Sequence, residues 1–187
     1  MADVRIKIPA ELFAIAESSR FDGTFDVDVL EAGPDDYTFQ EPVEWFVDVS
    51  NTGSALLVAG KATGVGSCAC ARCLSDVSYE FDGDIEGYFL VNPDEGWEDD
   101  GEEELGDDEF DVLPEDHIID LEPLIRAALI VDAPEQPLCR EDCKGICPMC
   151  GQDLNEGTCD CGRGAGLEEF DRAANPFAAL ADYKFEE

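Results

Sequence analysis

The sequence predicts an α+β fold: an N-terminal antiparallel β-sheet or small barrel, then a helix, a cysteine-rich module of the zinc-knuckle kind and a short C-terminal helix. Three observations predict it. Apolar and polar residues alternate repeatedly through the first 90 residues, as in half-buried strands. Apolar residues then recur at helical spacing after residue 120. Six cysteines follow between residues 139 and 161. We expect a β-rich domain over 1–91, an acidic insertion or linker over 92–116, and the helices and cysteine module over 117–187.

The strands follow from period-2 patterns and turn residues. In the first strand, for example, Val4, Ile6 and Ile8 alternate with charged residues. Asn51-Thr52-Gly53 predicts a turn between two central strands, and Gly83 and Gly87 predict bulges or bends in the last one. A short helix is expected over 10–20. The strands are expected over 3–8, 24–30, 43–50, 54–64 and 77–90.

Two helices are predicted in the last third of the chain. Asp120 is the expected N-cap of the first, and Pro123 suits its first turn because the missing N–H is harmless there. Asn175 and Pro176 are the expected cap and first residue of a C-terminal helix within 171–184.

The charge of the chain is extreme. Its 187 residues include 46 acidic and 11 basic ones, for a formal net charge of -35. Residues 92–116 contain 14 Asp and Glu and no Lys or Arg. This composition predicts a solvated loop or, alternatively, a segment that attracts a basic partner electrostatically. Direct contact with RNA or DNA is disfavoured because affinity for phosphates depends on Lys and Arg. A salt-adapted proteome is the alternative source of this acidity.

The cysteine module has the spacing of a metal site. Cys147-Pro148-Met149-Cys150-Gly151 can place two thiolates on one ion across a tight turn. The other two ligands come from Cys139 and Cys143 or from Cys159 and Cys161, and the spacing does not choose between the pairs. Zinc is the expected metal, with an iron–sulfur cluster as the alternative. The candidate ligands are Cys139, Cys143, Cys147, Cys150, Cys159 and Cys161.

A second, smaller cysteine motif precedes this module. Cys70 and Cys73 form a CxxC pair at the expected tip of a strand turn. A pair cannot close a metal site alone. Three interpretations of the pair stay open: it is redox-active, it joins distant cysteines at a shared metal site, or it packs as small apolar side chains.

These segments together resemble the YceD family of bacterial proteins. The matching pieces are Cys70-Ala-Arg-Cys73-Leu74, the helical stretch 119–130, the run from Cys143 to Asn155, and the ending Asn175-Pro-Phe-Ala-Ala-Leu180. The resemblance covers roughly 65–184 and implies a role in accumulation of large-subunit (23S) ribosomal RNA. It implies no catalytic residues.

The leading hypothesis is therefore a ribosome-biogenesis accessory protein that binds a basic ribosomal protein or large-subunit assembly factor. The second hypothesis is a zinc-thiolate redox switch. We expect no enzymatic activity, because the single histidine, His117, is expected to be exposed to solvent and the sequence has no catalytic or phosphate-binding motif. We also expect no small-molecule substrate. Without an apolar run of signal-peptide or membrane length, a cytoplasmic location is expected.

Overall fold

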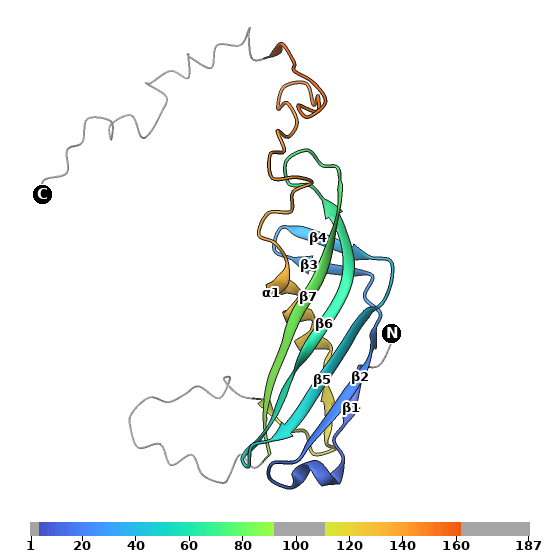
Figure 1. Ribbon diagram of the computed structural model, residues 1–187, viewed down its shortest axis with the longest axis vertical. Coiled ribbons are helices and arrows are strands. Elements are labelled where there is room, and N and C mark those ends of the chain that lie inside the picture. Colours follow the sequence, from blue (N-terminus) through green and yellow to red (C-terminus); the bar gives the residue numbers. More distant parts are fainter. Residues whose placement is uncertain (1–3, 92–110, 162–187) are drawn as a thin grey trace, which may run out of the picture. The chain divides into compact units, whose positions relative to one another are not determined.

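The computed structural model describes residues 4–91 and 111–161 (Figure 1). By their internal contacts the residues group into two compact units. Unit 1 comprises Met1–Cys70 and Ser75–Pro137, and unit 2 comprises Ala71–Leu74 and Leu138–Glu187. The predicted helix within 171–184 and most of the acidic segment lie outside the described residues, and the three predicted domain boundaries stay a prediction.

A twisted antiparallel sheet dominates unit 1 (Figure 1). Its longest strands, β6 (Ala55–Ala69) and β7 (Asp76–Leu90), pair along their whole length. β5 (Val43–Asn51) lies on the other side of β6, and β2 (Ser18–Phe25) pairs with β5. The hairpin of β3 (Val29–Ala32) and β4 (Asp35–Phe39) joins β6 through β4. In the described residues the pairings form no closed ring, so the sheet is open rather than a barrel.

Short segments complete the strand pairing. β1 (Arg5–Lys7) pairs antiparallel with β9 (Ile118–Asp120), two segments more than a hundred residues apart in the chain. β8 (Asp111–Val112) adds to β7 in parallel. The end of the predicted acidic insertion thus takes part in the sheet.

One α-helix covers one face of this sheet. α1 (Glu122–Asp132) packs on β7 and β6, and buries Ile125, Ala128 and Leu129. The N-cap residue is Leu121, one position after the predicted Asp120, but the Asp120 carboxylate accepts a hydrogen bond of 3.0 Å from the N–H of Glu122 and so stabilises the first turn. The helix is too short to cross a membrane, and no other described helix is long and apolar enough to do so.

The predicted helix over 10–20 is wrong beyond its first turn. A 3-10 helix, η1 (Ala10–Phe13), forms there, and the chain then turns through Ala16 at a φ of 68°. Ser18 and the residues after it pair with β5 instead. The predicted strand over 24–30 is likewise divided, because β2 pairs with β5 whereas β3 pairs with β4. Long-range pairing overrides the local pattern in both places.

The two glycines of β7 serve a purpose other than the predicted bulges. The register between β6 and β7 continues without a break through Gly83 and Gly87. A Cβ on Gly83 would lie 2.5 Å from the carbonyl oxygen of Ala128, and one on Gly87 would lie 2.8 Å from a methyl carbon of Leu124. These glycines admit the close approach of α1 to the sheet.

Candidate metal centres

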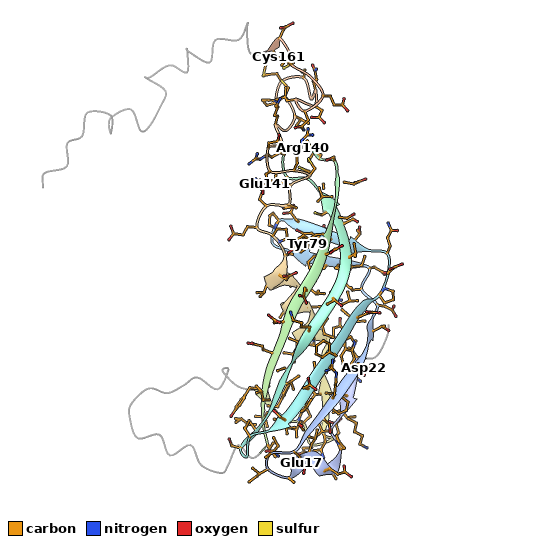
Figure 2. All side chains as sticks on the ribbon, in the orientation of Figure 1. Glu17, Asp22, Tyr79, Arg140, Glu141 and Cys161 are labelled. Atoms are coloured by element: carbon orange, nitrogen blue, oxygen red, sulfur yellow. The ribbon has the colours of Figure 1, made fainter. Side chains whose placement is uncertain are left out.

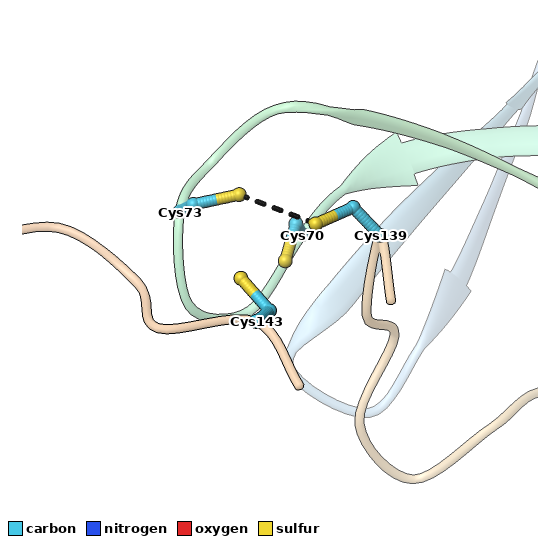
Figure 3. A group of neighbouring side chains, drawn as sticks. All are labelled: Cys70, Cys73, Cys139 and Cys143. Carbon is cyan, nitrogen blue, oxygen red and sulfur yellow. Dashed lines mark hydrogen bonds between the residues drawn. The ribbon is translucent and has the colours of Figure 1, made fainter. Parts of the chain in front are cut away.

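Four cysteines that are far apart in the chain bring their sulfur atoms together at the tip of the β6–β7 hairpin (Figure 3). Cys70 and Cys73 come from the hairpin turn, and Cys139 and Cys143 come from the segment after α1. All four Sγ atoms lie within 4.8 Å of one another. The Sγ atoms of Cys73 and Cys139 are 3.6 Å apart. We call these four residues the Cys70 group.

Backbone interactions shape the turn that carries Cys73. The N–H of Cys70 donates to the carbonyl of Ser75 at 2.8 Å, and Leu74 takes a φ of 62°, which closes the turn. Arg72 fastens this turn to the segment after Cys143. Its guanidinium donates to the Cys143 carbonyl at 2.9 Å, and its own carbonyl accepts from the N–H of Ile146 at 3.2 Å.

A second group of four cysteines lies entirely within unit 2. It consists of Cys147, Cys150, Cys159 and Cys161, whose Sγ atoms also lie within 4.8 Å of one another. We call it the Cys147 group. The chain turns tightly between Cys147 and Cys150, and Gly151 leaves this turn at a φ of 73° while its N–H donates to the Cys147 carbonyl at 2.8 Å. The tight turn and the left-handed conformation of Gly151 are as the sequence predicts.

Hydrogen bonds prepare one thiol of each group for metal binding. The backbone N–H groups of Cys150 and Met149 lower the pKa of the Cys147 thiol to about 6. The Asn155 amide is the main cause that lowers the pKa of the Cys143 thiol. In contrast, the hydrogen bond to Cys150 raises the pKa of the Cys161 thiol to about 12. The thiolate is the form that binds a metal, so Cys147 is ready at neutral pH.

Both groups fit a tetrahedral ion. Four sulfur atoms at about 2.3 Å from a central zinc ion lie about 3.8 Å from one another. The separation of 3.6 Å between Cys73 and Cys139 agrees with this arrangement. All nine cysteines are free of disulfide bonds. Either group could therefore hold one metal ion with all four positions closed by protein, as in structural sites.

The structure divides the six predicted ligands between the two groups. Cys139 and Cys143 join Cys70 and Cys73, whereas Cys147 and Cys150 join Cys159 and Cys161. Of the three alternatives for the CxxC pair, its position beside Cys139 and Cys143 favours a shared site. The sequence carried a signal for this, since a lone pair of thiols needs two further ligands. Cys68 belongs to neither group and is buried in the sheet, where burial raises its pKa.

His117 takes no part in either group. It is exposed, as expected, and its ring lies 4.7 Å from that of Phe13.

Comparison of the chain with known protein families agrees with the cysteine pattern. The family described as "Large ribosomal RNA subunit accumulation protein YceD" matches residues 58–184, a range that includes both cysteine groups. The chain belongs to the YceD family. No solved structure matches the chain.

Relatives of this YceD protein come from bacteria and a plant. An uncharacterised protein of Mycobacterium tuberculosis is 35% identical over 106 residues, which is 57% of the chain and 48% of the relative. One of Mycobacterium leprae is 30% identical over 113 residues, or 60% and 49%. The Arabidopsis thaliana protein "Large ribosomal RNA subunit accumulation protein YCED homolog 1, chloroplastic" is 29% identical over 173 residues, or 79% and 51%. The chain spans about half the length of these relatives.

Proposed function

We propose that this protein is a ribosome-biogenesis accessory protein that supports accumulation of large-subunit (23S) rRNA by binding a basic protein partner. The observation that carries the proposal is the family match, because it spans the cysteine groups and the long β6–β7 hairpin. The mode of action that we propose is binding through an acidic sheet face of unit 1, with zinc holding the cysteine module in shape.

The sheet face opposite the core is strongly acidic. The outward side chains of four neighbouring strands, β2, β5, β6 and β7, include eight carboxylates and two cations. Asp22 on β2 is one of the carboxylates (Figure 2). The carboxylates are Asp22, Glu44, Asp48, Asp76, Glu80, Asp82, Asp84 and Glu86, and the cations are Arg20 and Lys61.

Both cations of this face are engaged by neighbours. Lys61 lies 3.0 Å from carboxylate oxygens of both Asp82 and Asp84. Arg20 lies 3.7 Å from Asp48, and its guanidinium stacks 4.0 Å from the centre of the Phe46 ring. The face therefore keeps an excess of negative charge. It favours association with a Lys- and Arg-rich protein and opposes direct contact with rRNA phosphates.

Zinc is the metal we assign to both cysteine groups. Sets of four thiolates are typical of structural zinc sites. The described part of unit 2 has almost no regular secondary structure and little buried apolar surface, so metal binding would supply much of its folding free energy.

A pull-down from cell extract tests the binding role. We expect the immobilised chain to retain a basic ribosomal protein or assembly factor, and to keep it after ribonuclease treatment. Replacing Glu80 and Glu86 by Lys should reduce this retention several-fold. The matched control replaces Glu31 and Asp36, an exposed pair on β3 and β4, with the same change in charge. Recovery of rRNA alone, insensitive to protease, would contradict the proposal.

A further inference from the structure

The two cysteine groups are joined by a short pair of antiparallel segments. Cys143 of the Cys70 group and Cys147 of the Cys147 group lie only four residues apart in the chain. The residues between them run beside residues 152–155, which belong to the loop between Cys150 and Cys159. Ile146 and Asp153 form an isolated antiparallel bridge. The N–H of Cys147 donates to the Gln152 carbonyl at 2.8 Å, and that of Leu154 donates to the Gly145 carbonyl at 2.9 Å.

Asn155 lies at the end of this pairing, beside Cys143. Its side-chain nitrogen is 3.4 Å from the Cys143 sulfur, within hydrogen-bond range for a sulfur acceptor. Its side-chain oxygen accepts from the N–H of Lys144 at 2.8 Å. The Asp153 carboxylate accepts from both the backbone N–H of Asn155, at 2.7 Å, and its side-chain nitrogen, at 2.8 Å. The amide is thereby held in one orientation, with a nitrogen-bound hydrogen toward the sulfur.

We propose that Asn155 couples the two cysteine groups, so that a metal ion in the Cys147 group strengthens metal binding in the Cys70 group. An ion in the Cys147 group fixes Cys147, Cys150 and Cys159, and so both ends of the loop 151–158 that carries Asn155. The ordered loop then presents the amide to Cys143. The inference rests on the proposed zinc sites and goes beyond them, because independent sites would bind zinc as well.

The physical basis is charge. Four thiolates around a divalent cation carry a net charge of about -2. Hydrogen bonds to the sulfur atoms disperse that charge, and loss of such a partner of a metal ligand typically costs 10–100-fold in metal affinity. The coupling is reciprocal, because an ion in the Cys70 group fixes Cys143 and with it the acceptor for Asn155.

Cobalt(II) binding to the full chain tests the coupling, since cobalt–thiolate absorption reports each ion bound. One background keeps only the Cys70 group, through Cys159→Ser and Cys161→Ser. We expect this background to bind cobalt at the Cys70 group about 10-fold more weakly than the intact chain does. Asn155→Ala in the intact chain should weaken the Cys70 group by a similar factor. In the background that lacks the Cys147 group, the same substitution should add little.

A matched pair of variants separates the hydrogen bond from loop structure. Asn155→Asp keeps the oxygen that accepts from Lys144 but removes the donor to sulfur, and Asp153→Asn made together with it avoids two facing carboxylates. This double variant should weaken the Cys70 group and shift its sulfur-to-cobalt absorption to lower energy. Gln152→Ala lies in the same loop and keeps the backbone carbonyl that Cys147 contacts. It should change neither the affinity nor the absorption.

The outcomes distinguish this inference from the proposed function. Two ions bound with unchanged affinities in the Asn155 variants would overturn the coupling and leave the zinc sites standing. Failure of the unaltered chain to bind any ion at the two groups would overturn both.

Discussion

Gly145 lies directly against the carbonyl group of Arg72: a Cβ atom on Gly145 would be 2.9 Å from the Arg72 oxygen. Gly145 also has a φ of 74°, which favours glycine. This contact ties the turn that carries Cys73 to the segment that follows Cys143, and a side chain would push the two apart.

Gly145→Ala should therefore destabilise the metal-bound module, by about 1–2 kcal/mol for the left-handed backbone and by more for the contact with Arg72. The matched control is Gly151→Ala. Gly151 has nearly the same φ of 73°, but no atom lies within 4 Å of its added Cβ. Denaturant unfolding of the zinc-loaded protein, followed by metal release, compares the two. Equal losses would show that the approach of Arg72 has no energetic weight.

The close packing of α1 on β7 leads to a second prediction. Gly83→Ala would place a Cβ 2.5 Å from the backbone oxygen of Ala128, so the helix must move away from the sheet. We expect a loss of about 2–3 kcal/mol in the free energy of unfolding of unit 1. Gly87→Ala meets side-chain atoms, a Leu124 methyl carbon at 2.8 Å and a Phe89 ring carbon at 3.2 Å, which can shift more easily than backbone, so it should cost less. Thermal unfolding measured by circular dichroism ranks the two variants, and the reverse order would contradict the account.

The third prediction concerns Asn51, a buried polar residue at the end of β5. Its amide donates to the Leu12 carbonyl at 2.8 Å, and its side-chain oxygen accepts from the N–H of Gly53 at 2.7 Å. Asn51→Ala leaves both groups without this partner and should cost about 1–3 kcal/mol. Ser50→Ala, at the neighbouring position on the outer face, should be close to neutral. A near-neutral Asn51→Ala would mean that water or another group replaces the amide.

Removal of metal should unfold one part of the chain and spare the other. Once a strong chelator has stripped the metal completely, we expect hydrogen-exchange protection in residues 139–161 to fall, because little apolar burial remains to hold them. The backbone amides of β5 and the central part of β6 should keep their protection, since the sheet has its own core. Unchanged protection in residues 139–161 would show that metal does not stabilise their fold.

The elements that were foreseen from the sequence are those with strong local patterns. The alternation in β5 and β7 and the helical spacing around Leu121 and Ile125 are visible in short windows, and the structure confirms them. The strand over 3–8 is predicted from its alternation, but its pairing with β9 is not, because β9 is three residues long and carries no strand pattern of its own. The local pattern favours a helix through residues 14–20, because the strand that pairs with residues 18–20 lies about 30 residues further along the chain and is not visible in a short window.

The ligand sets could not be divided from spacing alone. Cys139 and Cys143 are nearer in sequence to the Cys147 pair than Cys159 and Cys161 are, yet they belong to the other group, so only the folded chain separates the two sets. What places Cys70 and Cys73 beside Cys139 is the return of the chain after α1, which no local pattern encodes. The role of Gly83 was also hidden, because it depends on how closely a helix approaches.

The metal content of the freshly purified protein, read together with X-ray absorption at the zinc edge, tests the central claim most directly. We expect two zinc ions per chain, each with four sulfur neighbours at about 2.3 Å. Cys139→Ser and Cys159→Ser, one in each group, should each remove a ligand from one site and lower the content toward one ion. Cys68→Ala, which alters a cysteine outside both groups, should leave two. A chain that holds neither zinc nor iron, or zinc bound mainly through oxygen, would contradict the account.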